Sequence, residues 1–510
     1  MALMTLDGLL RSCAQRWHDK PCLKTAEFGV TMSYQELDWQ ATAFATALLR
    51  NGCCPGDCVL LAFGNSPGFF AALFGCFRAG LVAVPVDPML APGELQAIVD
   101  HARPVQILVP EESEAVFHPL QRFGGMTVLD AETTLCGLLL DPVDGCPDDA
   151  TLQDNPDQPA LLLYTSGTTG RPKGVLYSHS MLLAKIEAIR RWFSFDESFR
   201  TLCLLPTHFG HGLICNCLSV FGYGGTLVIA PPFDLELMRR LWRIIEAHGV
   251  HYFSSVPTMA RLLMQHAAKQ PVDCPTSMRF VTCASAPLAA QEAVDFERMF
   301  GIPLLNCYGL TETSGWSACS PRDPQRSITS VGKALHGEIR IVGPDGQALP
   351  AGHHGEVQVK SPSVMSGYYL DSAQSGQVLR DGWLSTGDIG ELDEAGALML
   401  HARIKDLIIR AGKNVFPAEV DTVLMSHPEV ADACTVGLPD ALLGETVASC
   451  VVLRAGASLT GTALMSHARQ KLAAYKCPQR IVFVQALPRT SRGKVSRASL
   501  RPLFADATAS

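Results

Sequence analysis

Residues 164–174 read Tyr-Thr-Ser-Gly-Thr-Thr-Gly-Arg-Pro-Lys-Gly and directly follow the short apolar run 161–163. The glycines let the backbone adopt positive φ values and bring its N–H groups close to an anion. The Ser and Thr hydroxyls and the ammonium group of Lys173 add further donors and one positive charge. The stretch therefore predicts a loop that holds a polyphosphate.

This loop departs from the P-loop pattern G-x-x-x-x-G-K-[ST]. Lys173 follows Arg171 and Pro172 instead of a glycine, and Gly174 stands where the P-loop has Ser or Thr. A P-loop kinase or ATPase is therefore disfavoured. Taken alone, the stretch is equally consistent with a surface loop rich in Gly and Thr, so its interpretation depends on the rest of the chain.

Three further motifs follow, at residues 306–313 (Asn-Cys-Tyr-Gly-Leu-Thr-Glu-Thr), 385–388 (Ser-Thr-Gly-Asp) and 488–494 (Pro-Arg-Thr-Ser-Arg-Gly-Lys). With residues 164–174 they resemble, in order, the motifs of the adenylate-forming superfamily of acyl-CoA synthetases, aryl-CoA ligases and peptide-synthetase adenylation domains. Four such matches in order are very improbable by chance. The resemblance implies an acid–thiol ligase that makes an acyl-adenylate from ATP and then an acyl-CoA, with AMP and pyrophosphate as products.

Length and charge agree with such an enzyme. The 510 residues allow about three folding units at roughly 150 residues each. The net charge of −8 gives no general attraction to nucleic acid, so no nucleic-acid partner is expected. The 18 cysteines include no C-x-x-C pair and no Cys/His group at zinc spacing, which is typical of reduced thiols in the cytosol.

The apolar segments do not predict a membrane span. Residues 69–86 are interrupted by Arg78 and Gly80, which favours a buried helix followed by a buried strand. The first eleven residues carry Asp7 and lack a basic region, so they predict an amphipathic helix and not a signal peptide. The last four residues match no organelle address or lipidation site. A soluble, cytoplasmic protein is expected.

Apolar runs of strand length alternate with helical patterns in the first two thirds of the chain, at 58–63, 105–109, 226–230, 280–283 and 304–307. This alternation predicts α/β layers with largely parallel sheets. Residues 235–248 form one amphipathic helical pattern. After residue 330, alternating segments at 338–342 and 356–359 predict a β-rich part. A compact α+β unit follows, with a strand at 406–409 and a helix at 417–427.

The predicted fold class is α/β. A large N-terminal domain of layered α/β subdomains plus a β-rich subdomain is followed by a small, mobile α+β lid domain. Residues 402–406 (Ala-Arg-Ile-Lys-Asp) resemble the family's hinge. The implied boundaries are 1–402 for the AMP-binding domain with the ATP and acid sites, 403–405 for the hinge, and 406–510 for the lid. Lys405 would swing the lid; an ion-paired surface lysine is the alternative.

The resemblance implies a complete ATP site, because joining a carboxylate to a phosphate brings two anions together and their charge must be cancelled. Glu312 is the implied Mg²⁺ ligand, and Thr311 the implied contact of the α-phosphate. Tyr308 offers an aromatic face to adenine. The implied contacts of the β- and γ-phosphates come from the first motif and are Thr165, Ser166, Gly167, Thr168, Thr169 and Lys173.

Three charged residues complete the implied machinery. Asp388 accepts hydrogen bonds from both ribose hydroxyls, and Arg403 approaches the same sugar or a phosphate; such charge-assisted bonds contribute about 1.5–3 kcal/mol each. Lys494 is the implied catalytic residue, which neutralises the carboxylate and α-phosphate oxygens as they react. Read alone, Lys494 is more typical of a solvated basic tail. The S-x-x-K spelling at 491–494 lacks the partner motifs of penicillin-recognising enzymes.

The second half-reaction has its own implied residues. After pyrophosphate leaves, the lid of the family's enzymes rotates and the CoA thiol attacks the acyl-adenylate. Gly412 and Lys413 would then line the CoA channel, where small residues let an extended thiol arm pass close to the backbone. Lys413 would meet a nucleotide phosphate. The implied cofactors are ATP, Mg²⁺ and CoA.

The acid pocket is assigned to Phe209, Gly210, His211, Ala284 and Gly309. Residues 209–213, Phe-Gly-His-Gly-Leu, resemble the pattern of benzoate-type ligases, whereas many fatty acyl-CoA synthetases carry a histidine in place of Phe209. His211 would hydrogen-bond either a ring substituent or a backbone carbonyl. The expected substrate is an aryl or medium-chain acyl acid, with the aryl acid favoured.

Two other functions stay open. A stand-alone adenylating enzyme would load the acid onto the phosphopantetheine arm of a carrier protein in trans, since that arm carries the same thiol as CoA. An inactive acid or nucleotide sensor would keep the fold without the chemistry. The joint presence of Glu312, Asp388, Arg403 and Lys494 argues against the sensor. Either a monomer or a homodimer is compatible with the sequence.

Overall fold

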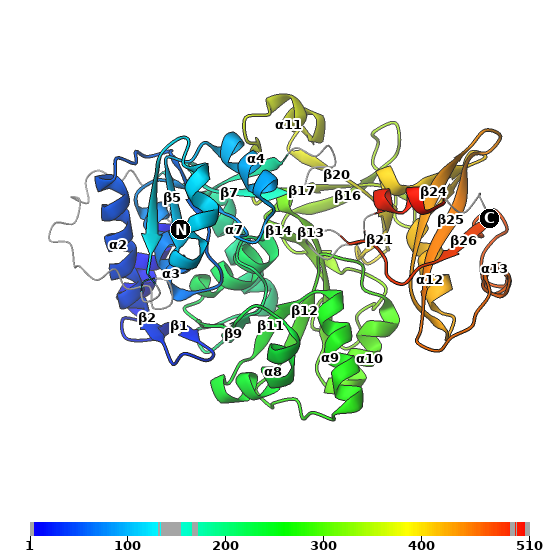
Figure 1. Ribbon diagram of the computed structural model, residues 1–510, viewed down its shortest axis with the longest axis horizontal. Coiled ribbons are helices and arrows are strands. Elements are labelled where there is room, and N and C mark those ends of the chain that lie inside the picture. Colours follow the sequence, from blue (N-terminus) through cyan, green and yellow to red (C-terminus); the bar gives the residue numbers. More distant parts are fainter. Residues whose placement is uncertain are drawn as a thin grey trace. The chain divides into compact units, whose positions relative to one another are not determined.

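The computed structural model describes residues 5–130, 133, 155–165, 172–489, 495 and 497–504. The chain divides into two compact units (Figure 1), of which the first is Met1–Ile339 with Val359–Leu384 and the second is Arg340–Gln358 with Ser385–Ser510. Two predicted sites, the loop 166–171 and the segment 490–494 with Lys494, lie outside the described residues.

The first unit contains a nine-stranded sheet whose inner strands are parallel and whose edges are antiparallel. Its order is β15 (Lys333–Ala334), β14 (Gly315–Cys319), β13 (Leu304–Leu310), β12 (Phe280–Cys283), β11 (Tyr252–Ser255), β9 (Arg200–Cys203), β10 (Thr226–Ile229), β1 (Pro21–Thr25) and β2 (Thr31–Ser33). The inner strands are short and buried on both faces, as expected for parallel strands covered by helices.

A seven-stranded sheet in the same unit combines a parallel core with an antiparallel hairpin. Its order is β18 (Gly367–Tyr368), β8 (Lys173–Ser178), β7 (Pro159–Thr165), β4 (Val82–Pro85), β3 (Cys58–Leu61), β5 (Gln106–Pro110) and β6 (Gly125–Leu129). The predicted phosphate loop connects β7 to β8, at the end of a strand buried along most of its length.

Helices cover both sheets of the first unit. They are α1 (Leu6–Arg16), α2 (Tyr34–Arg50), α3 (Pro67–Arg78), α4 (Pro92–Ala102), α5 (Glu114–Phe117), α7 (His179–Phe193), α8 (Leu235–His248), α9 (Pro257–Lys269), α10 (Ala290–Phe300) and α11 (Ser372–Val378). Figure 1 shows α8, α9 and α10 in green beside β11 and β12, and side chains of these elements form one buried hydrophobic cluster. The predicted helix 235–248 is confirmed as α8, with Asp234 capping its start and Gly249 (φ +57°) its end.

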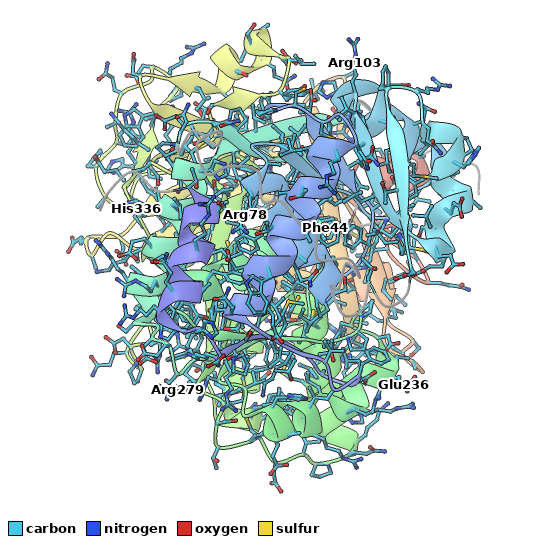
Figure 2. All side chains as sticks on the ribbon, turned by 90° about the vertical axis from the view of Figure 1, so that its left-hand side faces the viewer. Phe44, Arg78, Arg103, Glu236, Arg279 and His336 are labelled. Carbon is cyan, nitrogen blue, oxygen red and sulfur yellow. The ribbon has the colours of Figure 1, made fainter. Side chains whose placement is uncertain are left out.

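A buried ion pair joins α1 and α3, which are separated along the chain by α2. Arg78, labelled in Figure 2, ends α3 and donates from Nε to Asp7 of α1 at 2.7 Å. Its Nη1 also donates to the main-chain oxygen of Asp38 at 2.6 Å. Beside it, α2 and α3 touch so closely that a Cβ on Gly75 would lie 2.4 Å from Cβ of Phe44.

None of the helices in the described part of the chain combines the length and the apolar character that a membrane span needs.

The second unit contains most of a five-stranded sheet and all of a second one. The first has the order β16 (Glu338–Val342), β17 (Gly355–Lys360), β20 (Trp383–Leu392) and β19 (Leu379–Arg380), with β21 (Leu398–Arg403) also pairing with β20. The second has the order β23 (Lys413–Val415), β22 (Ile408–Arg410), β25 (Gly444–Leu453) and β24 (Val430–Asp440), with β26 (Arg480–Phe483) beside β25. Helices α12 (Pro417–Met425) and α13 (Gly461–Arg469) pack on this second sheet around Val420, Leu424 and Leu464.

Two predicted elements near the hinge differ from the observed ones. The strand expected at 406–409 is displaced to β22 because Ile404–Asp406 form a 3₁₀ turn, in which the N–H of Leu407 donates to the carbonyl of Ile404. The helix expected at 417–427 ends at Met425, where the N–H of Ser426 caps the last turn. The strands at 280–283 and 338–342 have the expected bounds.

Candidate active site

The two ends of the predicted phosphate loop face each other across the β7–β8 hairpin. Thr165, the last residue of β7, is directly opposite Lys173, the first residue of β8. Four further predicted phosphate contacts, Ser166, Gly167, Thr168 and Thr169, belong to the loop outside the described residues. The hairpin thus brings one hydroxyl and one ammonium group to the mouth of the loop.

Strand β18 adds Tyr368 to this group. It pairs antiparallel with β8, with Tyr368 opposite Val175, two residues from Lys173. The ammonium group of Lys173 lies 5.4 Å from the centre of the Tyr368 ring, within the range of a cation–π contact. The Tyr368 hydroxyl donates a 2.8 Å hydrogen bond to Oε1 of Glu312. Burial, and next the negative charge of Glu312, raises the pKa of Tyr368, which keeps this hydroxyl protonated as a donor.

The second motif forms the end of β13 and the short 3₁₀ turn Thr311–Thr313. The main chain of this turn is held on two sides: the buried Tyr177 hydroxyl donates to the carbonyl of Thr311 at 2.6 Å, and the N–H of Met365 donates to the carbonyl of Glu312 at 2.8 Å. Tyr308, earlier in β13, is 7% exposed. The side chains of Thr311 and Glu312 therefore stand on a fixed backbone.

The Glu312 carboxylate suits a magnesium ion. Mg²⁺ prefers hard oxygen ligands, usually one or two carboxylates together with phosphate oxygens and water. Tyr368 orients this carboxylate through Oε1. A neutral hydroxyl in that position holds the carboxylate without cancelling its charge. A cavity of about 490 Å³ lies next to this group, lined by residues of β18 and α11 including Tyr368, Tyr369 and Ser375.

The third motif and Arg403 meet in the second unit. Asp388 of β20 is directly opposite Arg403 of β21, and Nε of Arg403 lies 2.7 Å from Oδ1 of Asp388. The Asp388 side chain is 8% exposed and that of Arg403 is 43% exposed. The motif is anchored through Thr386, whose hydroxyl donates to the carbonyl of Val357 in β17. The pair presents a fixed carboxylate beside a partly exposed guanidinium group.

The residues predicted for the acid pocket converge in the first unit. His211 begins a π-helical segment (His211–Cys217), a rare conformation that is frequent at functional sites. Its Nδ1 lies 3.0 Å from the hydroxyl of Ser285, next to Ala284, and the centres of its ring and of the Trp316 ring lie 5.4 Å apart in a T-shaped arrangement. Gly309 pairs with Trp316 across β13 and β14.

Two backbone features constrain the residues predicted for this pocket. A Cβ on Gly309 would lie 1.9 Å from the carbonyl oxygen of Gly315, so this position requires glycine. Ser285 has φ +72°, an uncommon conformation for a residue with a side chain, and it holds the hydroxyl that contacts His211. Phe209 is two residues before His211, is partly exposed, and packs against His208 at 4.3 Å between ring centres.

The residues predicted for the hinge and the CoA channel lie in the second unit. Lys405 is exposed in the turn Ile404–Asp406. Gly412 (φ +76°) and Ala411 (φ +49°) form the two-residue turn between β22 and β23, which requires positive φ at both positions. Lys413 follows this turn, with its ammonium group 4.8 Å from the centre of the Tyr475 ring.

Sequence reasoning missed three residues that contact the predicted site residues. Tyr368 and Tyr177 hold the second motif, while Trp316 contacts His211. Ser285 lies in the segment 283–288 that the sequence had indicated as a further wall of the acid pocket. Tyr177 is 134 residues from Thr311 and Tyr368 is 56 residues from Glu312, and no local pattern marks either tyrosine as a neighbour of the second motif.

Comparison with known proteins gives consistent matches along the chain. Residues 10–369 match the family model of AMP-binding enzymes, and residues 419–494 match that of the AMP-binding enzyme C-terminal domain. The chain is 32% identical to sulfoacetate–CoA ligase of Cupriavidus necator, covering 97% of each protein. It is also 32% identical to feruloyl-CoA synthase of Amycolatopsis sp., covering 93% of this chain and 94% of that protein.

A solved structure shares the fold. ATP-bound MatB from Rhodopseudomonas palustris superposes with a TM-score of 0.89 at 28% identity, covering 99% of this chain and 100% of that one. The predicted fold class, α/β layers with a separate C-terminal α+β part, is confirmed.

Proposed function

This chain belongs to the family of AMP-binding enzymes, and on that premise we propose that it converts an aryl or medium-chain acyl carboxylic acid into its CoA thioester. It is an AMP-forming acid–CoA ligase that uses ATP and CoA. The identity of the acid and the roles of individual residues are the proposal.

Two steps make up the proposed reaction. A carboxylate oxygen attacks the α-phosphorus of ATP, the bond from that phosphorus to the bridging oxygen breaks, and pyrophosphate leaves. The thiol of CoA then attacks the acyl carbonyl carbon, and AMP departs with the former carboxylate oxygen. The first step joins two anions, so cations and hydrogen-bond donors near the phosphates lower its barrier most.

The group formed by Lys173, Tyr368 and Glu312 carries the proposal. It sets an ammonium group over the ring of one tyrosine and a carboxylate at the hydroxyl of the same tyrosine, at the mouth of the loop that follows β7. Lys173 is suited to phosphate oxygens and Glu312 to a magnesium ion that arrives with ATP. Such an ion would supply positive charge against the phosphates, while Tyr368 orients the carboxylate. Thr165, Ser166, Gly167, Thr168 and Thr169 are proposed to surround the same phosphates.

Asp388 and Arg403 are proposed to bind the ribose. A carboxylate that is nearly buried and already held on one oxygen is rigid enough to accept two hydroxyl groups at defined angles. Arg403 is exposed enough to reach a phosphate without leaving Asp388. Lys494 is proposed as the catalytic lysine of adenylation, Lys405 as the hinge, and Gly412 with Lys413 as the wall of the CoA channel.

Two classes of acid are supported by specific observations. Phe209, Gly309 and the ring of Trp316 near His211 favour a flat aryl acid, in line with the feruloyl-CoA synthase relative. The polar pair His211–Ser285 favours a small acid with a second polar group, in line with the sulfoacetate–CoA ligase relative. The aryl acid is our first choice.

The test is mass spectrometry of the purified protein with ATP, Mg²⁺ and CoA against a panel of acids. The panel contains benzoates, cinnamates, fatty acids of graded length, and small acids with a second carboxylate or sulfonate. An aryl or medium-chain acyl-CoA formed together with AMP supports the proposal, and omission of ATP is the control. A product limited to a small dianionic acid would establish the second candidate instead. Acyl-adenylate without thioester would point to a carrier protein as acceptor, and binding of acid and ATP without any product would point to a sensor.

A further inference from the structure

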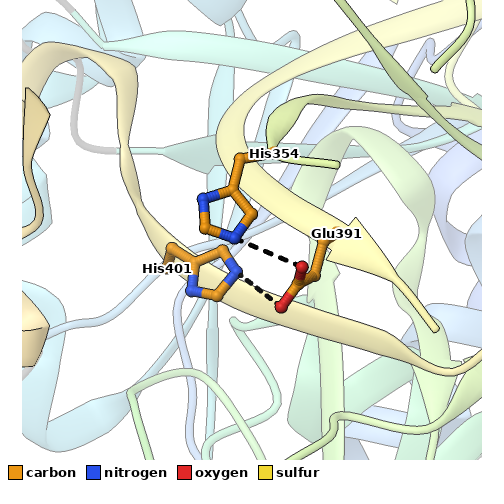
Figure 3. Close-up of side chains that lie close together, drawn as sticks. All are labelled: His354, Glu391 and His401. Carbon is orange, nitrogen blue, oxygen red and sulfur yellow. Dashed lines mark ion pairs between the residues drawn. The ribbon is translucent and has the colours of Figure 1, made fainter. Parts of the chain in front are cut away.

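Two histidines and a glutamate in the second unit, none of them assigned a role above, point their ring nitrogens and carboxylate at one another. Figure 3 shows His354, Glu391 and His401 as this group. Nε2 of His354 lies 3.2 Å from Oε2 of Glu391, and Nε2 of His401 lies 3.3 Å from Oε1 of the same carboxylate. In the described part of the chain, no other set of three His, Cys, Asp or Glu side chains brings its ligand atoms within 4.8 Å of one another.

The fold brings the three residues together by two irregularities of the sheet. The N–H of Gly352 donates to the carbonyl of Leu392, which lays the segment before β17 against the end of β20 and sets His354 beside Glu391. Between β20 and β21 the register shifts, so that Ile389 is opposite Ala402 and Gly390 is opposite Leu400. His401 is left without a partner residue across this ladder. Irregularities of this kind redirect side chains and are frequent next to functional sites.

The nitrogen–oxygen distances fit the spacing of two ligand atoms on one metal ion. Two ligand atoms of a tetrahedral zinc ion with bonds of about 2.0–2.1 Å lie about 3.3 Å apart, close to both observed nitrogen–oxygen distances. Nε2 of His401 is shielded from solvent and makes no hydrogen bond to any described residue. Its 3.3 Å approach to Glu391 therefore lacks hydrogen-bond geometry.

An aromatic side chain from the neighbouring helix fixes the two imidazoles. The rings of His354 and His401 lie 4.3 Å apart, and Phe416, which caps the start of α12, lies 5.7 Å from the first and 5.5 Å from the second. Fixed rings lose little freedom when they bind an ion.

A cavity of about 340 Å³ adjoins the group and leaves room for further ligands. Its walls include both histidines, Phe416, Glu419 and Lys476. Lys476 holds both carboxylate oxygens of Glu419 at 2.7 Å. The cavity is thus lined by a second carboxylate whose charge is already compensated, so water is the expected additional ligand.

We propose that His354, Glu391 and His401 form a binding site for a divalent transition-metal ion of the zinc class. Two imidazole nitrogens and one carboxylate select Zn²⁺ and similar ions over Mg²⁺, which takes oxygen ligands. The site binds its ion independently of ATP and of the magnesium that accompanies it. By linking the segment before β17 with β20 and β21, a bound ion stabilises this sheet against unfolding.

Titration of the metal-free, full-length protein with ZnCl₂ tests the proposal. Calorimetry is done under reducing conditions with excess Mg²⁺, so that oxygen-ligand sites are occupied. His354→Ala and Glu391→Gln are compared with His353→Ala, which removes the neighbouring exposed histidine, whose Nδ1 lies 3.2 Å from the carbonyl oxygen of Ala351. His354 is chosen because its side chain is 46% exposed, so its loss spares the packing. X-ray absorption at the zinc edge identifies the ligands.

One saturable site is expected in the wild type and in His353→Ala. Its affinity should fall at least about 10-fold in His354→Ala and in Glu391→Gln, as for the loss of a ligand. X-ray absorption of the wild type should show imidazole and oxygen in the first coordination sphere of the zinc ion. Three results overturn the proposal: no saturable binding in the wild type, equal affinity in His354→Ala and the wild type, or a coordination sphere dominated by sulfur from cysteines.

Discussion

The hydroxyl of Tyr368 lies 2.8 Å from the carboxylate of Glu312, although 56 residues separate them in the chain. Strand β18 creates this relationship by pairing with β8, which also carries Lys173. One tyrosine therefore touches both the proposed metal ligand and the proposed phosphate cation. The geometry makes Tyr368 a positioning residue for Glu312.

Tyr368→Phe removes the hydroxyl and keeps the ring under Lys173. A hydrogen bond to a charged group contributes about 1.5–3 kcal/mol, so kcat/KM for ATP should fall by about 10-fold or more, with a higher Mg²⁺ concentration needed for half-maximal rate. Pyrophosphate release at varied Mg²⁺ measures both. The matched control is Tyr369→Phe, whose hydroxyl faces Cys58. An unchanged Mg²⁺ requirement in Tyr368→Phe would show that this hydroxyl does not position the metal ligand.

Asp388→Asn tests the ribose assignment. The variant should raise KM for ATP by about 10-fold or more, since it replaces a charged acceptor by a neutral one. It should also lose most of its preference for ATP over 2′-deoxyATP. In the variant the charged contact to the 2′-hydroxyl of ATP is lost, and 2′-deoxyATP has no such hydroxyl to lose. Steady-state rates with the two nucleotides give the ratio, and Glu394→Gln, on the exposed turn after β20, is the control. A retained preference in Asp388→Asn would contradict the assignment.

Lys494→Ala separates the two half-reactions. Loss of one cation from the transition state should slow acyl-adenylate formation on the order of 10²–10³-fold, while preformed acyl-adenylate should still react with CoA. Rapid-quench assays of each step measure the two rates, with Arg492→Ala as the control in the same segment. Equal losses in both steps, or no loss in the first, would remove Lys494 from its proposed role.

Lys405→Pro should have the opposite effect. Proline fixes φ near −65° and lacks an N–H group, so it restricts the torsion that the proposed lid rotation requires. Thioester formation should become slow while acyl-adenylate formation stays close to the wild-type rate. Lys405→Ala keeps the torsional freedom and serves as the control. The hinge assignment fails if Lys405→Pro forms thioester at the normal rate.

Lys185 of α7 gives a pH-dependent stability that can be measured apart from activity. Its side chain is 1% exposed, donates to the carbonyl of Trp316, and has its pKa lowered by burial from 10.5 to about 8. Between about pH 8 and pH 10.5, Lys185 carries a proton in the unfolded chain but not in the folded protein. The free energy of unfolding therefore rises with pH across this range. The full effect is at most about 3 kcal/mol.

The Lys185 effect is isolated by comparison with Lys185→Met. Urea unfolding near pH 7.5 and near pH 10 gives the free energy of unfolding of each protein. Cysteines and tyrosines also titrate in this range, but they are common to both proteins and cancel in the difference. The wild type should gain stability relative to Lys185→Met as the pH rises. A difference that is independent of pH would mean that Lys185 stays charged in the folded protein.

Local patterns were sufficient to recognise the family and to place elements such as α8, but not the strand after the hinge. The helix Leu235–His248 has the bounds expected from its apolar periodicity, because the capping residues Asp234 and Gly249 stop it at both ends. The four motifs were recognisable because they keep their spacing and chemistry within short segments. The predicted position of the strand after the hinge was wrong, because the turn Ile404–Asp406 depends on a main-chain hydrogen bond that no residue type in the sequence indicates.

What the sequence by itself determined is therefore the set of chemical groups and the reaction class. The tertiary structure decided which of these groups meet. Asp7 argued against a signal peptide and Arg78 against a membrane helix, yet only the packing of α1 on α3 showed that each neutralises the other in the core. The contacts of Tyr368 with Glu312 and of His354 with His401 were likewise visible only in the folded structure. Contacts between distant segments depend on strand pairing and packing, which are properties of the whole folded chain and leave no mark in a local pattern.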